Sequence, residues 1–310
     1  MKKRVVEQFL MENKLSFHKN FKIGKFLSMK VGGKVGYIIF TESNRDLTNL
    51  LIFLNSIGTD YILIGGGTNI IFPDSCTELI VIINRCSDIS KESGNLLKVN
   101  SGVRNSVFLE YCKKSEISGF EFLAGIPGTL GGAAAVNAGA FGKSISEKIK
   151  GGDIFTFKGD VEYKELSFFD FEYRNSKFKY GKDIILNIYL KFDIGEKKTI
   201  RDEIERIHLL RREKHPPYSE HSAGCFFKNP LINGKKISAG KLIDDCKLRG
   251  YETKTTKISS KHSNFIVNRG TAAFSDIESL EKIIADTVKM RSGIQLEREV
   301  IFVSPEGKKY

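Results

Sequence analysis

Two glycine-rich segments constrain the fold of this chain more than any other feature of its sequence. The first is Gly65-Gly66-Gly67, which follows the apolar run at residues 61–64 and precedes Thr68 and Asn69. Consecutive glycines let the backbone turn tightly and aim several N–H groups into one concavity, which suits a diphosphate. The segment departs from the dinucleotide fingerprint G-x-G-x-x-G because Ile70 replaces the third glycine, and it lacks the lysine of a P-loop. A tight strand-to-loop turn is the alternative interpretation.

The second segment has the sequence GIPGTLGG at residues 125–132 and continues as NAGAFG at residues 137–142. Residues 122–142 carry no charge, but Pro127, Asn137 and the glycines make them unsuited to a membrane span, so we expect a buried system of turns. Small residues allow a flat ligand to lie against bare backbone, and they equally allow close packing between a helix and a sheet. Two such segments in one chain favour a large cofactor that carries a diphosphate.

The composition is that of a folded protein with an excess of positive charge. The chain has 310 residues, of which 41% are hydrophobic and 28% charged, enough for one large or two to three ordinary domains. Its 49 lysines and arginines exceed its 37 acidic residues by 12. Such an excess suits an anionic partner, whether nucleic acid, a membrane surface or a phosphorylated small molecule.

The cysteines and the N-terminal residues indicate a cytoplasmic protein. The five cysteines are scattered and form no C-x-x-C pair, so we expect neither a disulfide framework nor a zinc site. Glu7 and Glu12 interrupt what would have to be the apolar core of an export signal. We therefore expect a reducing compartment, no membrane insertion and no bound metal.

Apolar runs, helical periodicity and turn residues predict a mixed α+β chain. Strands are predicted at residues 37–40, 61–64, 79–83, 96–99, 184–192, 264–267 and 296–303. Helices are predicted at residues 45–57, opened by Ser43 or Asn44, and at residues 106–114, 200–214, 239–246 and 276–290. The sequence GEKK at residues 195–198 predicts a boundary between two domains, residues 1–196 and 197–310.

Seven motifs resemble, in the same order, those of one enzyme family. They are IGGGTNII at residues 64–71, FEFLAGIPGTLGGAAAVNAGAFG at 120–142, YRNSKF at 173–178, SAGCFFKNP at 222–230, GKLIDDCKLRG at 240–250, KHSNFIVN at 261–268 and LEREV at 296–300. The family is UDP-N-acetylenolpyruvoylglucosamine reductase, the flavoenzyme that makes UDP-N-acetylmuramate for peptidoglycan. Several ordered motifs across nearly the whole chain are far more specific than any single one.

The resemblance implies an FAD-binding fold of the vanillyl-alcohol-oxidase (PCMH) type. Two α+β subdomains in residues 1–196 would hold FAD, and an α+β domain in residues 197–310 would bind the substrate. The resemblance also implies a ligand for the glycine segments: Gly65, Gly66, Gly67, Thr68 and Asn69 would hold the FAD diphosphate, and Gly125, Ile126, Pro127, Gly128, Thr129, Gly131 and Gly132 would line the flavin. Residues 28–33 (SMKVGG) resemble the family's early FAD-contacting turn.

The implied reaction has two halves. NADPH reduces FAD, and reduced FAD then delivers hydride from N5 to the methylene carbon of UDP-N-acetylglucosamine enolpyruvate, giving UDP-N-acetylmuramate. Cationic or hydrogen-bonding groups must hold the substrate carboxylate so that it can take up electron density. The other vinyl carbon must receive a proton from a positioned acid. The product serves cell-wall biogenesis, and through it cell shape and division.

Three residues match the family's catalytic positions. Arg174 matches the arginine at the substrate carboxylate, and its planar guanidinium suits that anion; on residue type alone, a surface arginine is the alternative. Glu299 matches the family glutamate, but strand alternation places Glu297 on the same face, so the choice rests on the motif. Cys225 stands where the family usually has a serine proton donor. A thiol, with a reference pKa of about 8.5, can donate the proton instead, and a small buried cysteine is the alternative.

Three further residues are candidates for substrate binding. Lys214 resembles the family lysine that neutralises phosphates of the substrate or of NADPH, Asn229 resembles a substrate-side amide, and His262 is a weaker candidate. The other four histidines match no metal spacing. The stretch from Arg174 to Lys214 is too short for the tyrosine-bearing insertion of the family's longer subtype, so we expect the shorter, type II subtype.

Two other functions fit part of the sequence. A related FAD oxidoreductase acting on a phenol or a hydroxy acid is one, although the flavin-linking histidine of some such enzymes has no counterpart near the glycine motifs. A basic nucleic-acid-binding module is the other, disfavoured because lysine and arginine are spread through the chain. We therefore expect UDP-N-acetylglucosamine enolpyruvate and NADPH as partners and no nucleic acid. The oligomeric state stays open, with a monomer as one alternative.

Overall fold

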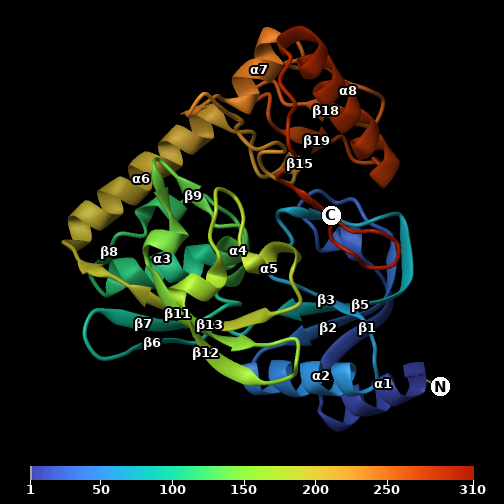
Figure 1. The fold of residues 1–310 in the computed structure, drawn as a ribbon, viewed down its shortest axis with the longest axis vertical. Coiled ribbons are helices and arrows are strands. Elements are labelled where there is room, and N and C mark those ends of the chain that lie inside the picture. The colour runs from blue at the N-terminus through green and yellow to red at the C-terminus, as the bar shows by residue number, and fades with distance from the viewer. Residues whose placement is uncertain (1) are drawn as a thin grey trace. The chain divides into compact units, whose positions relative to one another are not determined.

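The computed structural model describes residues 2–310, which form two compact units (Figure 1). Unit 1 contains the chain up to Lys19, Tyr37–Gly66 and Leu79–Leu209, and unit 2 contains Asn20–Gly36, Gly67–Glu78 and Leu210–Tyr310. The chain thus passes between the units after residues 19, 36, 66, 78 and 209. The predicted domains 1–196 and 197–310 remain a prediction; the last division between the compact units lies inside helix α6 (Lys197–Lys214).

A four-stranded sheet has the order β1-β2-β5-β3 and contributes to the first core of unit 1. Its strands are β1 (Ser16–Lys22), β2 (Lys34–Thr41), β5 (Ser75–Asn84) and β3 (Tyr61–Ile64), with β3 and β5 parallel. Apolar side chains of α1 (Lys2–Glu12) and α2 (Asn44–Ser56), among them Leu10 and Leu50, pack with Ile39 and Ile82 of the sheet. The Ser43 hydroxyl accepts the Asp46 N–H at 3.1 Å, which confirms Ser43 as the residue that begins α2.

The second core of unit 1 lies against a five-stranded sheet of order β12-β11-β13-β7-β6. The strands are β6 (Ile89–Lys91), β7 (Leu96–Asn100), β11 (Ile149–Phe155), β12 (Val161–Glu165) and β13 (Ile184–Lys191), all antiparallel to their neighbours. Helices α3 (Asn105–Lys114) and α4 (Leu130–Ala135) contribute Phe108 and Ala134 to this core. The sequence did not predict β11 and β12, because β11 contains two glycines and β12 is mostly charged and exposed.

Unit 2 is built on a three-stranded antiparallel sheet of order β15-β19-β18. The strands are β15 (His221–Ser222), β19 (Ile266–Asn268) and β18 (Thr256–Ile258), and helices α7 (Ala239–Asp245) and α8 (Phe274–Ser292) lie beside them (Figure 1). The core brings Ile243, Ile266 and Leu280 together with Met29 and Ile71. The stretches 20–36 and 67–78 are therefore part of the hydrophobic core of unit 2.

The predicted strand at 296–303 is regular only over β20 (Ile301–Phe302), which pairs in parallel with β4 (Ile70–Ile71). Residues 297–299 instead pair irregularly with residues 226–228, through a bridge between Phe227 and Arg298. The predicted strand at 264–267 is β19, which begins two residues later. The remaining short elements are β8 (Ile117–Ser118), β9 (Gly139–Ala140), β10 (Lys143–Ser144), α5 (Lys177–Tyr180), β14 (Asp193–Ile194), β16 (Leu231–Ile232), β17 (Lys235–Lys236) and the 3-10 turns Ile23–Lys25, Glu121–Leu123, Ile145–Glu147 and Leu166–Phe169.

Within residues 2–310, no helix is both long and apolar enough to span a bilayer. None of the cysteines in this range forms a disulfide; Cys225 is half-buried, whereas Cys76, Cys86, Cys112 and Cys246 are buried. The same range contains no group of three or more histidine, cysteine, aspartate or glutamate side chains arranged to hold a metal ion.

Candidate active site

The two glycine segments touch each other within unit 1. A Cβ atom on Gly65 would lie 2.2 Å from Thr129 Oγ1, and one on Gly66 would lie 2.7 Å from the Cα atom of Gly128. Both distances are shorter than real Cβ atoms adopt. Any side chain at residue 65 or 66 would therefore force the segments apart, so the glycines are required by this contact.

The second segment is held by hydrogen bonds from the start of α4. The N–H groups of Leu130 and Gly131 donate to the carbonyls of Val103 at 2.9 Å and Ser101 at 2.8 Å. The Gly132 N–H donates to the Thr129 hydroxyl at 3.2 Å, which caps the helix. These three amides are bonded within the protein, so they are not free donors for an anion. A Cβ atom on Gly131 would lie 2.6 Å from the Cβ atom of Ser101, so this glycine permits close packing, whereas one on Gly132 would lie at ordinary contact distance from its neighbours.

The bare backbone of the first segment fits a diphosphate. Within residues 2–310, the N–H groups of Gly65 and Gly66 donate to no backbone carbonyl or side-chain acceptor. The chain passes into unit 2 at Gly67, whose φ of 62° lies in the left-handed region and whose carbonyl accepts the Ser28 N–H at 3.1 Å. Bare glycine backbone with unused donors is the arrangement that phosphate groups require.

Arg174 is bonded to the second glycine segment in unit 1. Its φ is 56°, and its Nη2 donates to the Gly139 carbonyl at 2.7 Å while Nη1 lies 3.4 Å from the Asn137 carbonyl. The Asn137 amide in turn donates to the Glu172 carbonyl at 2.8 Å. Arg174 is half-buried.

Cys225 and Glu299 come close together through their backbones in unit 2. The Glu299 N–H donates to the carbonyl of Phe226 at 2.8 Å, and the Lys228 N–H donates to the carbonyl of Glu297 at 2.8 Å. Glu299 therefore pairs with the residue that directly follows Cys225. The two predicted catalytic residues of unit 2 lie on neighbouring segments of one irregular antiparallel pair.

Glu297 and Glu299 have different environments in the structure, although strand alternation predicts the same face for both. The side chain of Glu297 is 73% exposed, and its carboxylate pairs with Lys228 Nζ at 2.5 Å. Glu299 is half-buried and adjoins the end of the first glycine segment, since the Ile301 N–H donates to the Asn69 carbonyl at 3.0 Å. Glu299 is thus the glutamate that lies among the predicted site residues of unit 2.

Asn264 is a contact residue that the sequence analysis missed. Its side chain accepts the Phe227 N–H at 2.9 Å and donates to the Phe227 carbonyl at 2.8 Å, and its own carbonyl accepts the Phe226 N–H at 2.7 Å. Its side chain is only 3% exposed. The signal was a polar amide next to the apolar run FIV in the motif KHSNFIVN, where a buried amide requires partners.

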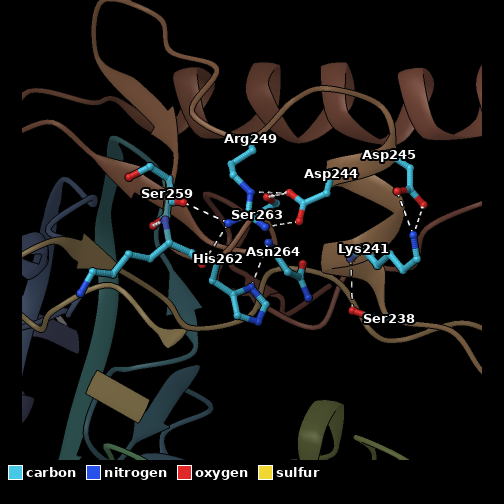
Figure 2. Close-up of polar contacts among 11 residues, drawn as sticks. Ser238, Lys241, Asp244, Asp245, Arg249, Ser259, His262, Ser263 and Asn264 are labelled. Carbon is cyan, nitrogen blue, oxygen red and sulfur yellow. Dashed lines mark hydrogen bonds and ion pairs between the residues drawn. The ribbon is translucent and has the colours of Figure 1, made fainter. Parts of the chain in front are cut away.

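The loop that carries His262 is braced by the motif at residues 240–250 (Figure 2). The Asp244 carboxylate accepts hydrogen bonds from Arg249 Nε at 3.0 Å and from the Ser263 hydroxyl, and Arg249 Nη1 donates to the Ser260 carbonyl at 3.1 Å. Burial alone would raise the pKa of Asp244, but the hydrogen bonds from Arg249 and Ser263 lower it below its usual value. The ionised carboxylate therefore fixes the loop at residues 260–263.

His262 itself is half-buried, and its Nδ1 accepts the Asn264 N–H at 3.2 Å (Figure 2). The neutral imidazole therefore carries its proton on Nε2. Its ring centroid lies 5.3 Å from that of His215, and burial lowers the pKa of both side chains, that of His215 to about 4. His262 is a neutral hydrogen-bond donor at neutral pH.

The remaining predicted substrate residues occupy different positions in unit 2. Lys214 is exposed at the last residue of α6. Asn229 is half-buried, and its Oδ1 accepts the Ala239 N–H at 2.9 Å, where α7 begins. Unit 1 therefore places Gly65 and Gly66 against Thr129 and Gly128, and it bonds Arg174 to the carbonyls of residues 137 and 139. Unit 2 brings Asn69 and Glu299 next to the segment that follows Cys225.

Protein-family models match two parts of the chain. The family model described as "FAD binding domain" matches residues 35–162. The family model described as "UDP-N-acetylenolpyruvoylglucosamine reductase, C-terminal domain" matches residues 216–303. A solved structure of the reductase from Thermus caldophilus has a TM-score of 0.74 at 24% identity, covering 93% of this chain and 98% of that chain. The predicted α+β FAD-binding fold is confirmed.

Curated relatives match over almost their whole length. The UDP-N-acetylenolpyruvoylglucosamine reductase of Chlamydia felis is 33% identical over 278 residues, covering 90% of this chain and 91% of the relative. That of Caldicellulosiruptor bescii is 33% identical over 301 residues, covering 96% and 94%. The chain therefore belongs to the UDP-N-acetylenolpyruvoylglucosamine reductase family of FAD-dependent oxidoreductases.

Proposed function

We propose that this chain reduces UDP-N-acetylglucosamine enolpyruvate to UDP-N-acetylmuramate with NADPH, in the cytoplasm, as a step of peptidoglycan precursor synthesis. Its family membership supports the reaction. The observation that carries the residue assignment is the pairing of Glu299 with Phe226, which brings Glu299 and Cys225 to neighbouring segments of unit 2. FAD, when bound, would supply the hydride-transfer chemistry of this reaction.

The glycine segments bind the cofactor through bare backbone. Gly65 and Gly66 have amides without a protein acceptor in residues 2–310, and these amides suit the FAD diphosphate. Gly125 and Gly128, with φ of 70° and 119°, let the backbone of the second segment approach the flat flavin without side chains. The absence of a side chain at Gly66 lets its backbone lie close to that of Gly128, so the two segments are adjacent.

Arg174 and Glu299 prepare the substrate for reduction. A guanidinium carries five N–H donors, so Arg174 can bond the carbonyls of residues 137 and 139 and still bind the substrate carboxylate. A positively charged group at that carboxylate stabilises the electron density that develops there. Glu299, half-buried beside Asn69, polarises the substrate.

Cys225 delivers the proton to the second vinyl carbon. The half-buried Cys225 is the most accessible of the five cysteines, while the other four are buried. A thiol is more acidic than a serine hydroxyl and can protonate an enolate-like carbon. The segment that follows it is fixed by the hydrogen bonds of Phe226 and Phe227, which limits the positions open to the thiol.

Lys214, Asn229 and His262 contribute to substrate and NADPH binding. The exposed ammonium of Lys214 neutralises phosphates. The Oδ1 atom of Asn229 is occupied by the Ala239 N–H, so Asn229 contacts the substrate through its Nδ2 group. His262, protonated on Nε2 because Nδ1 accepts a hydrogen bond, acts as a neutral donor.

Stopped-flow measurement of the two half-reactions tests the role of Cys225. In Cys225→Ala, flavin bleaching by NADPH should stay within about twofold of wild type, while flavin reoxidation by the substrate slows about hundredfold or more, the typical effect of removing a general acid. Cys225→Ser should retain much of the second rate. Cys246→Ala, which removes a buried cysteine of the same unit, serves as the control and should leave both rates within about twofold. Equal loss of both half-reactions in Cys225→Ala would contradict the assignment.

A further inference from the structure

The two residues after Cys225 are bonded on both sides by other segments of unit 2. On one side, the Asn264 side chain accepts the Phe227 N–H at 2.9 Å and donates to the Phe227 carbonyl at 2.8 Å. The backbone carbonyl of Asn264 accepts the Phe226 N–H at 2.7 Å. On the other side, the Glu299 N–H bonds the Phe226 carbonyl at 2.8 Å. Every backbone polar group of Phe226 and Phe227 therefore has a partner within this part of the protein.

The amide side chain of Asn264 makes both bonds to Phe227, which an ionised carboxylate or an apolar side chain cannot do. The N–H of a backbone residue needs an acceptor and its carbonyl needs a donor, and the Asn264 side chain presents both in one plane. A carboxylate offers acceptors only, and an apolar side chain offers neither. Because Phe226, Phe227 and Asn264 are 1%, 2% and 3% exposed, water does not replace the lost bonds.

Asn264 is in turn held by the loop that precedes it. Its N–H donates to His262 Nδ1, and the neighbouring Ser263 hydroxyl donates to the Asp244 carboxylate, which Arg249 also bonds (Figure 2). The loop at residues 260–263 therefore has few alternative conformations. A loop with a single conformation restricts the position of the segment to which it is hydrogen-bonded.

We propose that Asn264 is a positioning residue that sets the location of the Cys225 thiol relative to Glu299. The proposal deepens the proposed function and rests on it, since position matters for the reaction only if the thiol donates the proton. Asn264 acts through the backbone of Phe226 and Phe227, to which it is hydrogen-bonded.

Alkylation of Cys225 by iodoacetamide in the FAD-bound enzyme, located by peptide mass spectrometry, tests this placement without measuring activity. Asn264→Ala should raise the alkylation rate of Cys225 about fivefold or more, because the segment opens more often once two buried hydrogen bonds are lost. Flavin reoxidation by the substrate should slow about tenfold or more, while flavin reduction by NADPH stays within about twofold. Thr253→Ala, which removes four hydrogen bonds elsewhere in unit 2, should change neither the alkylation rate nor the ratio of the two half-reactions.

Asn264→Asp adds a pH signature that a general loss of stability does not produce. At neutral pH the carboxylate keeps the acceptor for the Phe227 N–H but faces the Phe227 carbonyl with a second oxygen, so Cys225 should alkylate faster than in wild type. As pH falls and the carboxyl is protonated, its O–H can donate to that carbonyl as the amide did. The ratio of variant to wild-type alkylation rates should then return toward one. If Asn264→Ala fails to fold, Asn264→Asp tests the positioning role through the alkylation rate of Cys225 and the rates of the two half-reactions.

An alkylation rate within about twofold of wild type in Asn264→Ala, or a ratio for Asn264→Asp that does not change with pH, would overturn the positioning role. The proposed function can fail separately. If Cys225→Ala reoxidises its flavin normally while Asn264→Ala still accelerates alkylation, then Asn264 positions the thiol but the thiol is not the proton donor.

Discussion

A methyl group at Gly66 should separate the two glycine segments. In the structure this methyl carbon would lie 2.7 Å from the Cα atom of Gly128, whereas ordinary contact begins at 3.4 Å, so the segments must move apart by at least 3.4 − 2.7 = 0.7 Å. Because the obstacle is backbone, no rotamer change relieves it. Overpacking of this kind costs about 1–3 kcal/mol, partly offset by about 0.4–1 kcal/mol from the less flexible unfolded chain, so Gly66→Ala should destabilise the protein by about 1–2 kcal/mol.

Gly132→Ala is the matched comparison. Its Cβ atom would lie 3.4 Å from Thr129 Oγ1, and the residue lies within helix α4 at an ordinary φ. Replacing a helical glycine with alanine gains about 0.5–1 kcal/mol. The same chemical change should therefore have opposite signs at two positions of the same site.

The assay is urea unfolding of the FAD-stripped proteins, followed by circular dichroism, with FAD affinity measured separately by flavin fluorescence. The midpoint should fall for Gly66→Ala and rise or stay constant for Gly132→Ala. FAD affinity of Gly66→Ala should weaken about tenfold or more, the equivalent of losing one hydrogen bond to a charged group. An unchanged midpoint for Gly66→Ala would show that the segments do not touch as described and would remove the geometric basis for the cofactor site.

Two further predictions concern single charged or titratable side chains. Glu299→Gln should slow flavin reoxidation by the substrate about tenfold or more, whereas Glu297→Gln, at an exposed surface pair, should stay within about twofold; the reverse order in stopped flow would reassign the carboxylate. Burial, followed by the positive charge of Arg211, lowers the pKa of His215 from 6.5 to about 4, so its contribution to stability is complete above pH 6.5 and is lost as pH falls toward 4. The full shift corresponds to about 3 kcal/mol, which partial exposure reduces to about 1–2 kcal/mol, so His215→Phe should lose less stability between pH 7 and pH 5 than wild type does. His208 is exposed on α6, so His208→Gln should lose as much unfolding free energy as wild type between pH 7 and pH 5, measured by urea titration. Equal losses in wild type, His215→Phe and His208→Gln would contradict the stabilising role of neutral His215.

Local sequence patterns predicted the elements whose stability is mostly local. Helix α2 has an N-terminal serine and a regular apolar stripe, and it begins where Ser43 predicts. The glycine segments were also recognisable, because runs of Gly have few structural uses. What the sequence could not indicate is that Gly65 and Gly66 contact Thr129 and Gly128, since that contact depends on how the strands between them pair.

The C-terminal part shows the limit of periodicity more sharply. Strand alternation placed Glu297 and Glu299 on one face, but residues 297–299 pair irregularly with 226–228, and the two glutamates differ in exposure. The sequence did not predict the contacts of Asn264, because a single amide in an apolar run has no periodic signature. Its importance arises from three hydrogen bonds to residues 37 and 38 positions earlier in the chain.

Unit 2 is assembled from three separated stretches, and this limits how the gene can be cut or recombined. Strand β20 needs Ile70 as its partner, the Phe274 N–H bonds the Asp74 carboxylate at 3.1 Å, and Asn268 donates to the Met29 carbonyl at 3.0 Å. A fragment that starts at residue 197 would lack all three partners and expose apolar core. Chimeras between relatives that cross over once near residue 200 would combine strand partners from different parents. Residues 20–36, 67–78 and 210–310 must therefore be inherited together for a working hybrid.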